Sequence, residues 1–252
     1  KQKGAVWVAV RVPDGTISAH ANQSRIREFP KNDPKNAVYA KDVISFAREK
    51  GWFTGKDDEF SFADAYAPLR GGTLRSCDGR VWSVFRRAAP SLNLSSDWIL
   101  AVPGAKPMPL AVKPDRKLTV KDVMELMRDH YEGTELDMTK DIGAGPWKLP
   151  YRWRPMGFRV DGVDYVNERA ISTQQTGYSF VAQLRSFLPA TVGGVLWFGV
   201  DDTYSTVYTP MYASIREVPR SFAVGTADFS AFSWDSAFWV FNFVSNFAYS
   251  RY

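Results

Sequence analysis

The chain has 252 residues, a net charge of +5 and a hydrophobic share of 45%, which excludes a disordered chain and leaves room for one large core or two small ones. Its lysines and arginines are interspersed with acids, as in residues 41–50 (KDVISFAREK), whereas nucleic-acid-binding proteins gather basic residues on one face. We therefore expect no nucleic-acid partner, and no membrane span because no run approaches the ~20 apolar residues that cross a bilayer.

The first predicted elements are two strands and three helices. Residues 5–12 and 16–21 have strand-like patterns, and the turn sequence Pro-Asp-Gly between them predicts a β-hairpin with a three-residue loop. Helical spacing of apolar residues predicts helices in three further segments, which are residues 40–50, 61–66 and 79–89.

The rest of the chain changes from irregular segments to strands. Residues 102–116 are rich in proline and predict irregular chain, and Thr119 is a candidate N-cap of a helix that runs to about residue 130. Strand patterns follow from Phe158 onward, and an apolar helix ends the chain. The strand segments after Phe158 are 163–173, 178–184 and 195–200. This order predicts an α+β fold, and we expect residues 1–252 to form a single domain.

Both ends of the sequence resemble cut points. The chain begins at Lys1 rather than at methionine and enters a strand-like run at Gly4, and it stops at Tyr252 directly after the apolar helix. We expect the chain to be part of a longer protein.

The residues that could bind metals or cofactors are few. The two histidines, His20 and His130, are far apart in the sequence, and the single cysteine provides no ligand pair. The glycine pairs lack the strand–loop–helix context of a phosphate-binding loop. We therefore expect no metal and no cofactor.

An acidic segment leaves two alternatives open. It could hold Ca²⁺ with the help of backbone carbonyls, but it lacks EF-hand spacing and also fits a solvated acidic loop, which we favour. Its members are Glu132, Glu135, Asp137 and Asp141.

Cys77 is the only candidate thiol nucleophile in this sequence. A reactive thiolate requires a neighbouring base or a positively charged environment. Arg75 and Arg80 are near Cys77 in the sequence, but neither histidine is. A lone cysteine is more often a small packed residue, and we favour that interpretation.

Two polar segments stand out as candidate sites. Residues 21–26 (ANQSRI) leave a predicted strand, so Asn22 could donate its amide to an oxyanion and Arg25 could pair with a substrate carboxylate. The alternative for Asn22 is an Asx turn that closes the hairpin. The second segment is Asn167-Glu168-Arg169, which lies within a predicted strand that leads to the polar residues 172–176; its alternative is an ordinary solvent-facing ion pair.

Several longer runs together resemble the cysteine dipeptidase family of N-terminal-nucleophile hydrolases, which are relatives of penicillin V acylase and bile salt hydrolase. The similarity covers almost the whole chain, and the runs are VAVRVPDGTISAHANQSRI, RGGTLRSCDGRVWSVFRRAAPSL, DHYEGTELDMT, GAGPWKLP, NERAISTQQTG and GGVLWFGVDDT. The resemblance implies a four-layer αββα sandwich with additional helices. It also implies an N-terminal cysteine, activated by its own α-amino group, that forms a thioester with a dipeptide substrate without a metal.

The chain departs from that pattern at its start. The N-terminal cysteine and its early acidic and arginine partners are absent, Lys1 cannot replace them, and Cys77 is internal. The resemblance therefore implies a downstream fragment whose partner is the missing N-terminal segment. Within it, Asn22 is mapped onto the oxyanion position and Arg169 onto the arginine that lines the site, with Arg25 expected to bind substrate.

Two other functions remain open from the sequence. One is a different amidohydrolase or acylase of the same superfamily. The other is a non-catalytic carbohydrate- or peptide-binding module, suggested by the 15% aromatic share. The tryptophans lie mostly in apolar runs such as VLWFGV, where core packing is the expected role. The sequence leaves the compartment and any homo-oligomer undetermined.

Overall fold

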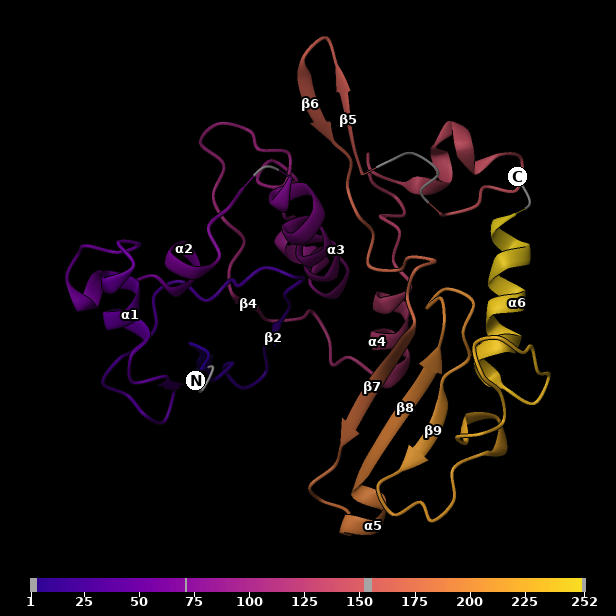
Figure 1. The fold of residues 1–252 in the computed structure, drawn as a ribbon. Coiled ribbons are helices and arrows are strands. Elements are labelled where there is room, and N and C mark those ends of the chain that lie inside the picture. Colours follow the sequence, from indigo (N-terminus) through magenta and orange to yellow (C-terminus); the bar gives the residue numbers. More distant parts are fainter. Residues whose placement is uncertain (1–3, 71, 152–155, 251–252) are drawn as a thin grey trace. The chain divides into compact units, whose positions relative to one another are not determined.

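The computed structural model describes residues 4–70, 72–151 and 156–250, so Lys1 lies outside the described part. The chain divides into two compact units (Figure 1). The first unit contains Lys1–Lys117 and Gly157–Arg169, and the second contains Leu118–Met156 and Ala170–Tyr252.

Short strands of the first unit form two antiparallel pairs. Strand β1 (Val8–Val10) pairs with β3 (Ala37–Tyr39), and β2 (Ile17–Ser18) pairs with β4 (Ala111–Val112). Both pairs therefore join segments that are distant in the sequence.

The predicted hairpin of the first two strands is wrong. Residues 13–15 do form a turn, in which the Thr16 N–H donates to the Pro13 carbonyl at 3.1 Å. The flanking strands then separate, and the Arg11 N–H donates to the Asn36 carbonyl at 2.8 Å to extend the β1–β3 pair. Turn residues specify a local bend, whereas the choice of pairing partner depends on which segments bury side chains together.

The three predicted helices of the first unit are confirmed. They are α1 (Val43–Glu49), α2 (Phe62–Tyr66) and α3 (Gly79–Ala88). Ser61 caps α2 by accepting a hydrogen bond from the Asp64 N–H, because the first turn of a helix has no internal acceptor for that group. A π-helical turn, Leu74–Asp78, leads directly into α3. Short 3₁₀ helices occupy Asp57–Glu59 and Pro90–Leu92.

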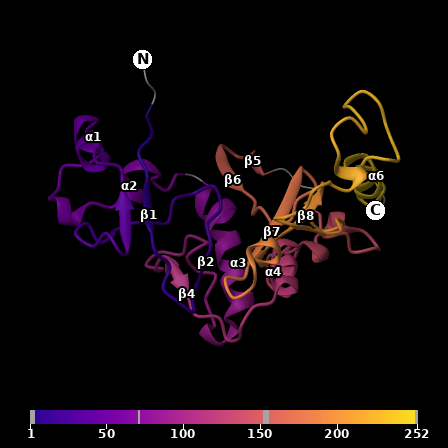
Figure 2. The same ribbon diagram turned by 90° about the horizontal axis from the view of Figure 1, so that it is seen from below.

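Two apolar clusters hold this unit together. Phe29, Val43 and Phe60 are buried in the cluster that packs α1 against the β1–β3 pair. Val81 and Phe85 of α3 are buried in the other cluster, which includes residues of the β2–β4 pair, and Figure 2 shows α3 beside these strands. The start of α3 is thereby fixed next to the chain that leaves β2.

The first unit also carries a hairpin from the later part of the chain. Strands β5 (Gly157–Val160) and β6 (Val163–Val166) pair in antiparallel register around a turn at Asp161–Gly162, where both residues have positive φ. The predicted strand over 163–173 is therefore too long. The ladder ends before Asn167 and Glu168, which are buried in irregular chain.

The second unit combines one antiparallel sheet with helices. The sheet has the order β7 (Tyr178–Leu184), β8 (Gly194–Val200), β9 (Thr209–Tyr212). Helix α4 (Val120–Met127) packs against β7, and its cap is the predicted Thr119, which forms a reciprocal capping box with Asp122. The other helical segments are Met138–Lys140, Ile142–Ala144, α5 (Ala190–Gly193), Arg220–Phe222 and α6 (Ala237–Tyr249).

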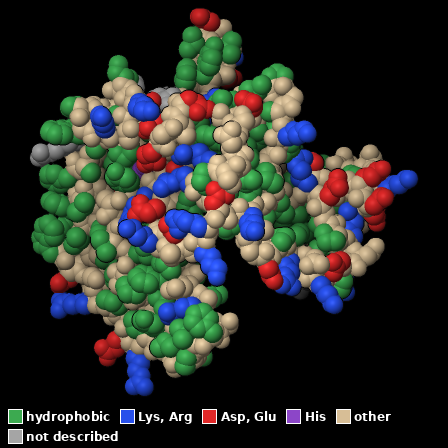
Figure 3. All heavy atoms as spheres, turned by 180° about the vertical axis from the view of Figure 1, so that it is seen from behind, with side chains coloured by type: hydrophobic (Ala, Val, Ile, Leu, Met, Phe, Trp, Pro, Cys, Tyr) green, Lys and Arg blue, Asp and Glu red, His purple; other side chains and the backbone are tan. Residues whose placement is uncertain are grey.

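The mixture of helices and antiparallel strands is that of an α+β protein, as the sequence predicts. Lys and Arg side chains alternate with Asp and Glu on the face seen in Figure 3. None of the helices in the described ranges combines the length and apolar character needed to cross a membrane.

Candidate functional site

The chain that leaves β2 presents the first candidate side chain, Asn22. Its backbone is left-handed, with φ of 56°, a conformation that asparagine tolerates better than most residues. Its side-chain oxygen accepts a hydrogen bond of 2.8 Å from Nη2 of Arg80, in the first turn of α3. The amide is exposed, so a ligand can reach it.

Arg25 lies three residues after Asn22, and its side chain, unlike that of Asn22, is buried. Its side chain is 6% exposed, and Nε is 3.6 Å from Oδ1 of Asp78. Its Nη1 donates to the Ala19 carbonyl at 2.9 Å, and Nη2 donates to the carbonyls of Met108 and Pro109. Burial lowers the pKa of Arg25, partly offset by the charge of Asp78. These contacts stabilise the loop that contains Arg25. The substrate-binding role of Arg25 stays a prediction.

The segment that leads into α3 supports both side chains. Nε of Arg80 donates to the Ser76 carbonyl at 2.8 Å, and its Nη2 lies 4.0 Å from the sulfur of Cys77. Asp78 accepts a hydrogen bond of 2.7 Å from the indole of Trp98. Cys77 is only 7% exposed and lies within the π-helical turn. Because it is an internal residue, its backbone nitrogen is part of a peptide bond and is not a free amino group.

A cavity of about 550 Å³ adjoins this loop. Its volume falls within the range of small-ligand pockets, roughly 300–1,000 Å³. Asn22 and Arg25 both line it, so the structure brings these two predicted residues to one cavity. The other lining residues are Val10, Val12, Ser18, Ala19, His20, Gln23, Ser24, Ile26 and Leu110.

Arg169 does not belong to the described lining of that cavity. Its side chain is exposed and lies in the same unit, just after β6. Its neighbours Asn167 and Glu168 are 6% and 2% exposed, so the alternative of an ordinary solvent-facing ion pair does not describe them. The role of Arg169 stays a prediction.

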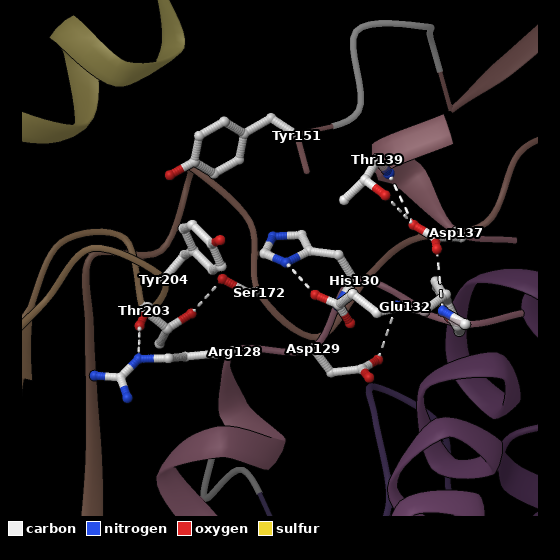
Figure 4. A network of polar contacts seen from close by, with 12 residues as sticks. Arg128, Asp129, His130, Glu132, Asp137, Thr139, Tyr151, Ser172, Thr203 and Tyr204 are labelled. Carbon is white, nitrogen blue, oxygen red and sulfur yellow. Dashed lines mark hydrogen bonds and ion pairs between the residues drawn. The ribbon is translucent and has the colours of Figure 1, made fainter. Parts of the chain in front are cut away.

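A second polar assembly lies in the other unit, after α4 (Figure 4). His130 is 1% exposed and sits edge-on to the rings of Tyr151 and Tyr204. Its Nδ1 is 3.4 Å from Oε1 of Glu132 without hydrogen-bond alignment, and its backbone N–H donates to Oε2 at 2.8 Å. Although burial acts to raise it, the contacts with the ring and N–H of His130 lower the pKa of Glu132 to about 2.

Asp202 is the centre of this assembly. It is fully buried and accepts hydrogen bonds from the Tyr151 hydroxyl, Ser172 and the Tyr204 N–H. Burial and the hydrogen bond to Asp202 raise the pKa of Tyr151. Arg128 closes the assembly from α4 by donating to the Thr203 carbonyl at 3.2 Å. The groups around Asp202 satisfy one another, which is typical of a network that fixes a structure. The two ring nitrogens of the buried His130, in contrast, have no hydrogen-bond partner among the residues that the structure describes.

The acidic segment is part of this same unit. Oδ1 of Asp137 accepts hydrogen bonds from the N–H and hydroxyl of Thr139, and Oδ2 accepts one from the Gly133 N–H. Within the described ranges no three His, Cys, Asp or Glu side chains come together as a metal would require. The carboxylates of Asp137 and Glu132 thus serve as acceptors within their own loop.

In a comparison with known proteins, residues 2–252 match the profile of peptidase family C69. The chain belongs to peptidase family C69. It is 28% identical to a probable dipeptidase of Salmonella dublin over 84% of this chain, and 25% identical to a probable dipeptidase of Latilactobacillus sakei over 87%. A probable dipeptidase B of Streptococcus pyogenes serotype M1 is 22% identical over 92%. These alignments cover 43%, 41% and 43% of the relatives, so the chain spans less than half of their length.

The sequence pointed to Asn22 and Arg25 but not to their supports. The contact between Arg80 and Asn22 has no signal in the sequence, because the two residues are 58 positions apart. The sequence does not predict the polar assembly around His130, because its members are scattered along the chain and none of them is unusual by itself. Its one signal was the dense run of polar and aromatic residues at 128–132 (RDHYE).

Proposed function

We propose that this chain forms part of a cysteine-type dipeptidase and supplies the oxyanion donor of its active site. The observation that carries the proposal is the exposed amide of Asn22 at the edge of a ligand-sized cavity, in a chain that belongs to a peptidase family. A preorganised amide donor stabilises the negative oxygen that develops when a nucleophile attacks a peptide carbonyl. In this proposal Arg25 contributes to substrate binding from the same cavity, and Arg169 lines the site.

The proposed nucleophile is a cysteine that the 252 residues do not include. Catalysis by an N-terminal cysteine requires a free α-amino group as the base, whereas the nitrogen of Cys77 is in a helical turn and its thiol is buried. The attacking thiolate forms a thioester with the substrate carbonyl carbon, and the amine of the second residue leaves with a proton. Water then hydrolyses the thioester and restores the thiol.

The finer fold, a four-layer αββα sandwich, is part of the proposal. Strand β7 supports it, because Ser179 and Val181 are buried on one face while Tyr178, Phe180 and Leu184 are 63%, 51% and 84% exposed on the other. A strand face with several large apolar side chains open to solvent is typical of a surface that another layer covers. Hydrophobic side chains also reach the surface in the view of Figure 3.

The test uses a protein of full family length and a panel of dipeptides. Asn22→Ala is expected to lower kcat by roughly 10²–10³, the usual loss for one oxyanion donor, and Cys77→Ser is expected to leave turnover unchanged. Unchanged turnover of Asn22→Ala would remove Asn22 from the mechanism. Dipeptide cleavage by the 252-residue chain alone, abolished by Cys77→Ser, would overturn the external nucleophile.

A further inference from the structure

The amide of Asn22 has two chemically opposite ends, and only one of them suits an oxyanion. Nδ2 is a donor, whereas Oδ1 is an acceptor whose lone pairs repel a negative oxygen. Rotation of the amide by 180° exchanges the two ends with little change of shape. An oxyanion donor at Asn22 therefore needs a neighbour that selects one orientation.

Arg80 meets that requirement. Its guanidinium can only donate hydrogen bonds, so the 2.8 Å contact from Nη2 is compatible with Oδ1 of Asn22 and incompatible with Nδ2. Arg80 is itself half-buried and anchored, because its Nε donates to the Ser76 carbonyl at 2.8 Å. A single planar group thus joins the rigid start of α3 to the loop that carries Asn22.

The positive charge of Arg80 also favours Asn22 as a hydrogen-bond donor. A cation on the carbonyl side of an amide polarises the group and makes its N–H bonds stronger donors. Lysine would keep the charge but could not hold the Ser76 carbonyl and Oδ1 with two nitrogens of one plane. The requirement is therefore for the guanidinium and not for positive charge alone.

We infer that Arg80 is a positioning residue that fixes the Asn22 amide with Nδ2 free to donate to the oxyanion of the reaction. The inference rests on the proposed function, since it assigns a purpose to the Arg80–Asn22 contact only if Asn22 acts as that donor. It makes the start of α3 part of the catalytic apparatus without any direct contact between Arg80 and substrate.

The first experiment needs no turnover. The side-chain amide signals of Asn22 are followed by ¹⁵N NMR in the 252-residue chain, with Arg80→Gln, Arg80→Lys and the control Arg75→Gln. We expect both Arg80 variants to shift the Asn22 signals and to increase the motion of the amide, and Arg75→Gln to leave them unchanged. Asn22 signals that do not respond to either Arg80 variant would refute the inference.

The second experiment measures kcat and KM in the protein of full family length. Arg80→Gln and Arg80→Lys are expected to lower kcat by about 10²-fold, as a misplaced group typically does, with little change in KM. Asn22→Asp retains the acceptor for Arg80 but replaces the donor, so it should lose at least as much kcat as Asn22→Ala without a lower melting temperature.

The double variant separates the inference from the proposed function. If Arg80 acts through Asn22, the Asn22→Ala/Arg80→Gln protein should be no slower than Asn22→Ala alone. Fully additive losses would refute the positioning role while leaving Asn22 as the oxyanion donor. Unchanged turnover in Asn22→Ala would refute both. Arg80→Lys provides the same comparison if Arg80→Gln fails to fold.

Discussion

Replacing Glu132 by glutamine should make the second unit less stable at neutral pH and less sensitive to acid. In the folded chain the contacts with His130 hold the pKa of Glu132 at about 2, against an ordinary value of 4.5. At 1.36 kcal/mol per pH unit this difference corresponds to ~3 kcal/mol. The side chain is 42% exposed, so solvent screening reduces the expected contribution to ~1–2 kcal/mol.

The pH dependence has a defined sign. Because the folded pKa is depressed, the stabilisation is complete above pH 4.5 and is lost as the pH falls towards about 2. Urea unfolding of the wild type and Glu132→Gln should therefore differ by ~1–2 kcal/mol at pH 7 and converge near pH 2. Glu217→Gln, at an exposed position of the same unit, is the control. A difference that persists undiminished at pH 2 would refute the reasoning.

Two further predictions concern single contacts. Asp78→Asn leaves the buried guanidinium of Arg25 without its carboxylate and should lower the free energy of unfolding by ~3 kcal/mol. The control is Asp14→Asn at an exposed position. Equal urea midpoints for the two variants would contradict the prediction. Thr119→Ala removes the capping box with Asp122 and should lower the free energy of unfolding by ~1 kcal/mol. Thermal unfolding measures this effect, and an unchanged melting temperature would show that the cap is dispensable.

Local signals in the sequence predicted helices better than strand partners. The end of α1 before Gly51 and the cap of α4 at Thr119 depend on residues within a few positions of each other, so the sequence states them directly. The partners of β1 and β2 lie in distant segments, and the short β9 strand carries a proline that hides its pattern. Pairing over such separations is decided by burial that no local window contains.

The candidate site shows the same division. Asn22 was recognisable because a polar residue that follows a strand is a frequent functional position. Its partner Arg80 is 58 residues away, and the sequence contains no sign of which guanidinium would meet the amide. The sequence thus indicated which group could act, whereas the fold alone shows what orients it.

The exposed apolar face of β7 allows a test of whether a second layer covers this strand in a protein of full family length. Phe180 is 51% exposed here and Val181, its neighbour on the opposite face, is 8% exposed. In the 252-residue chain, Phe180→Ala should leave stability nearly unchanged, whereas Val181→Ala should lower it by ~1.5–3 kcal/mol.

In a protein of full length the order should reverse if a second layer covers this face. Phe180→Ala would then remove a buried ring and lower the free energy of unfolding by ~3–5 kcal/mol, and hydrogen exchange of β7 would speed up in that variant. A Phe180→Ala effect that stays near zero at full length would show that the face remains open to solvent, and the four-layer arrangement would fail. Because Phe180 pairs directly with Phe198 of β8, the same comparison at Phe198 checks that the response belongs to the face and not to one side chain.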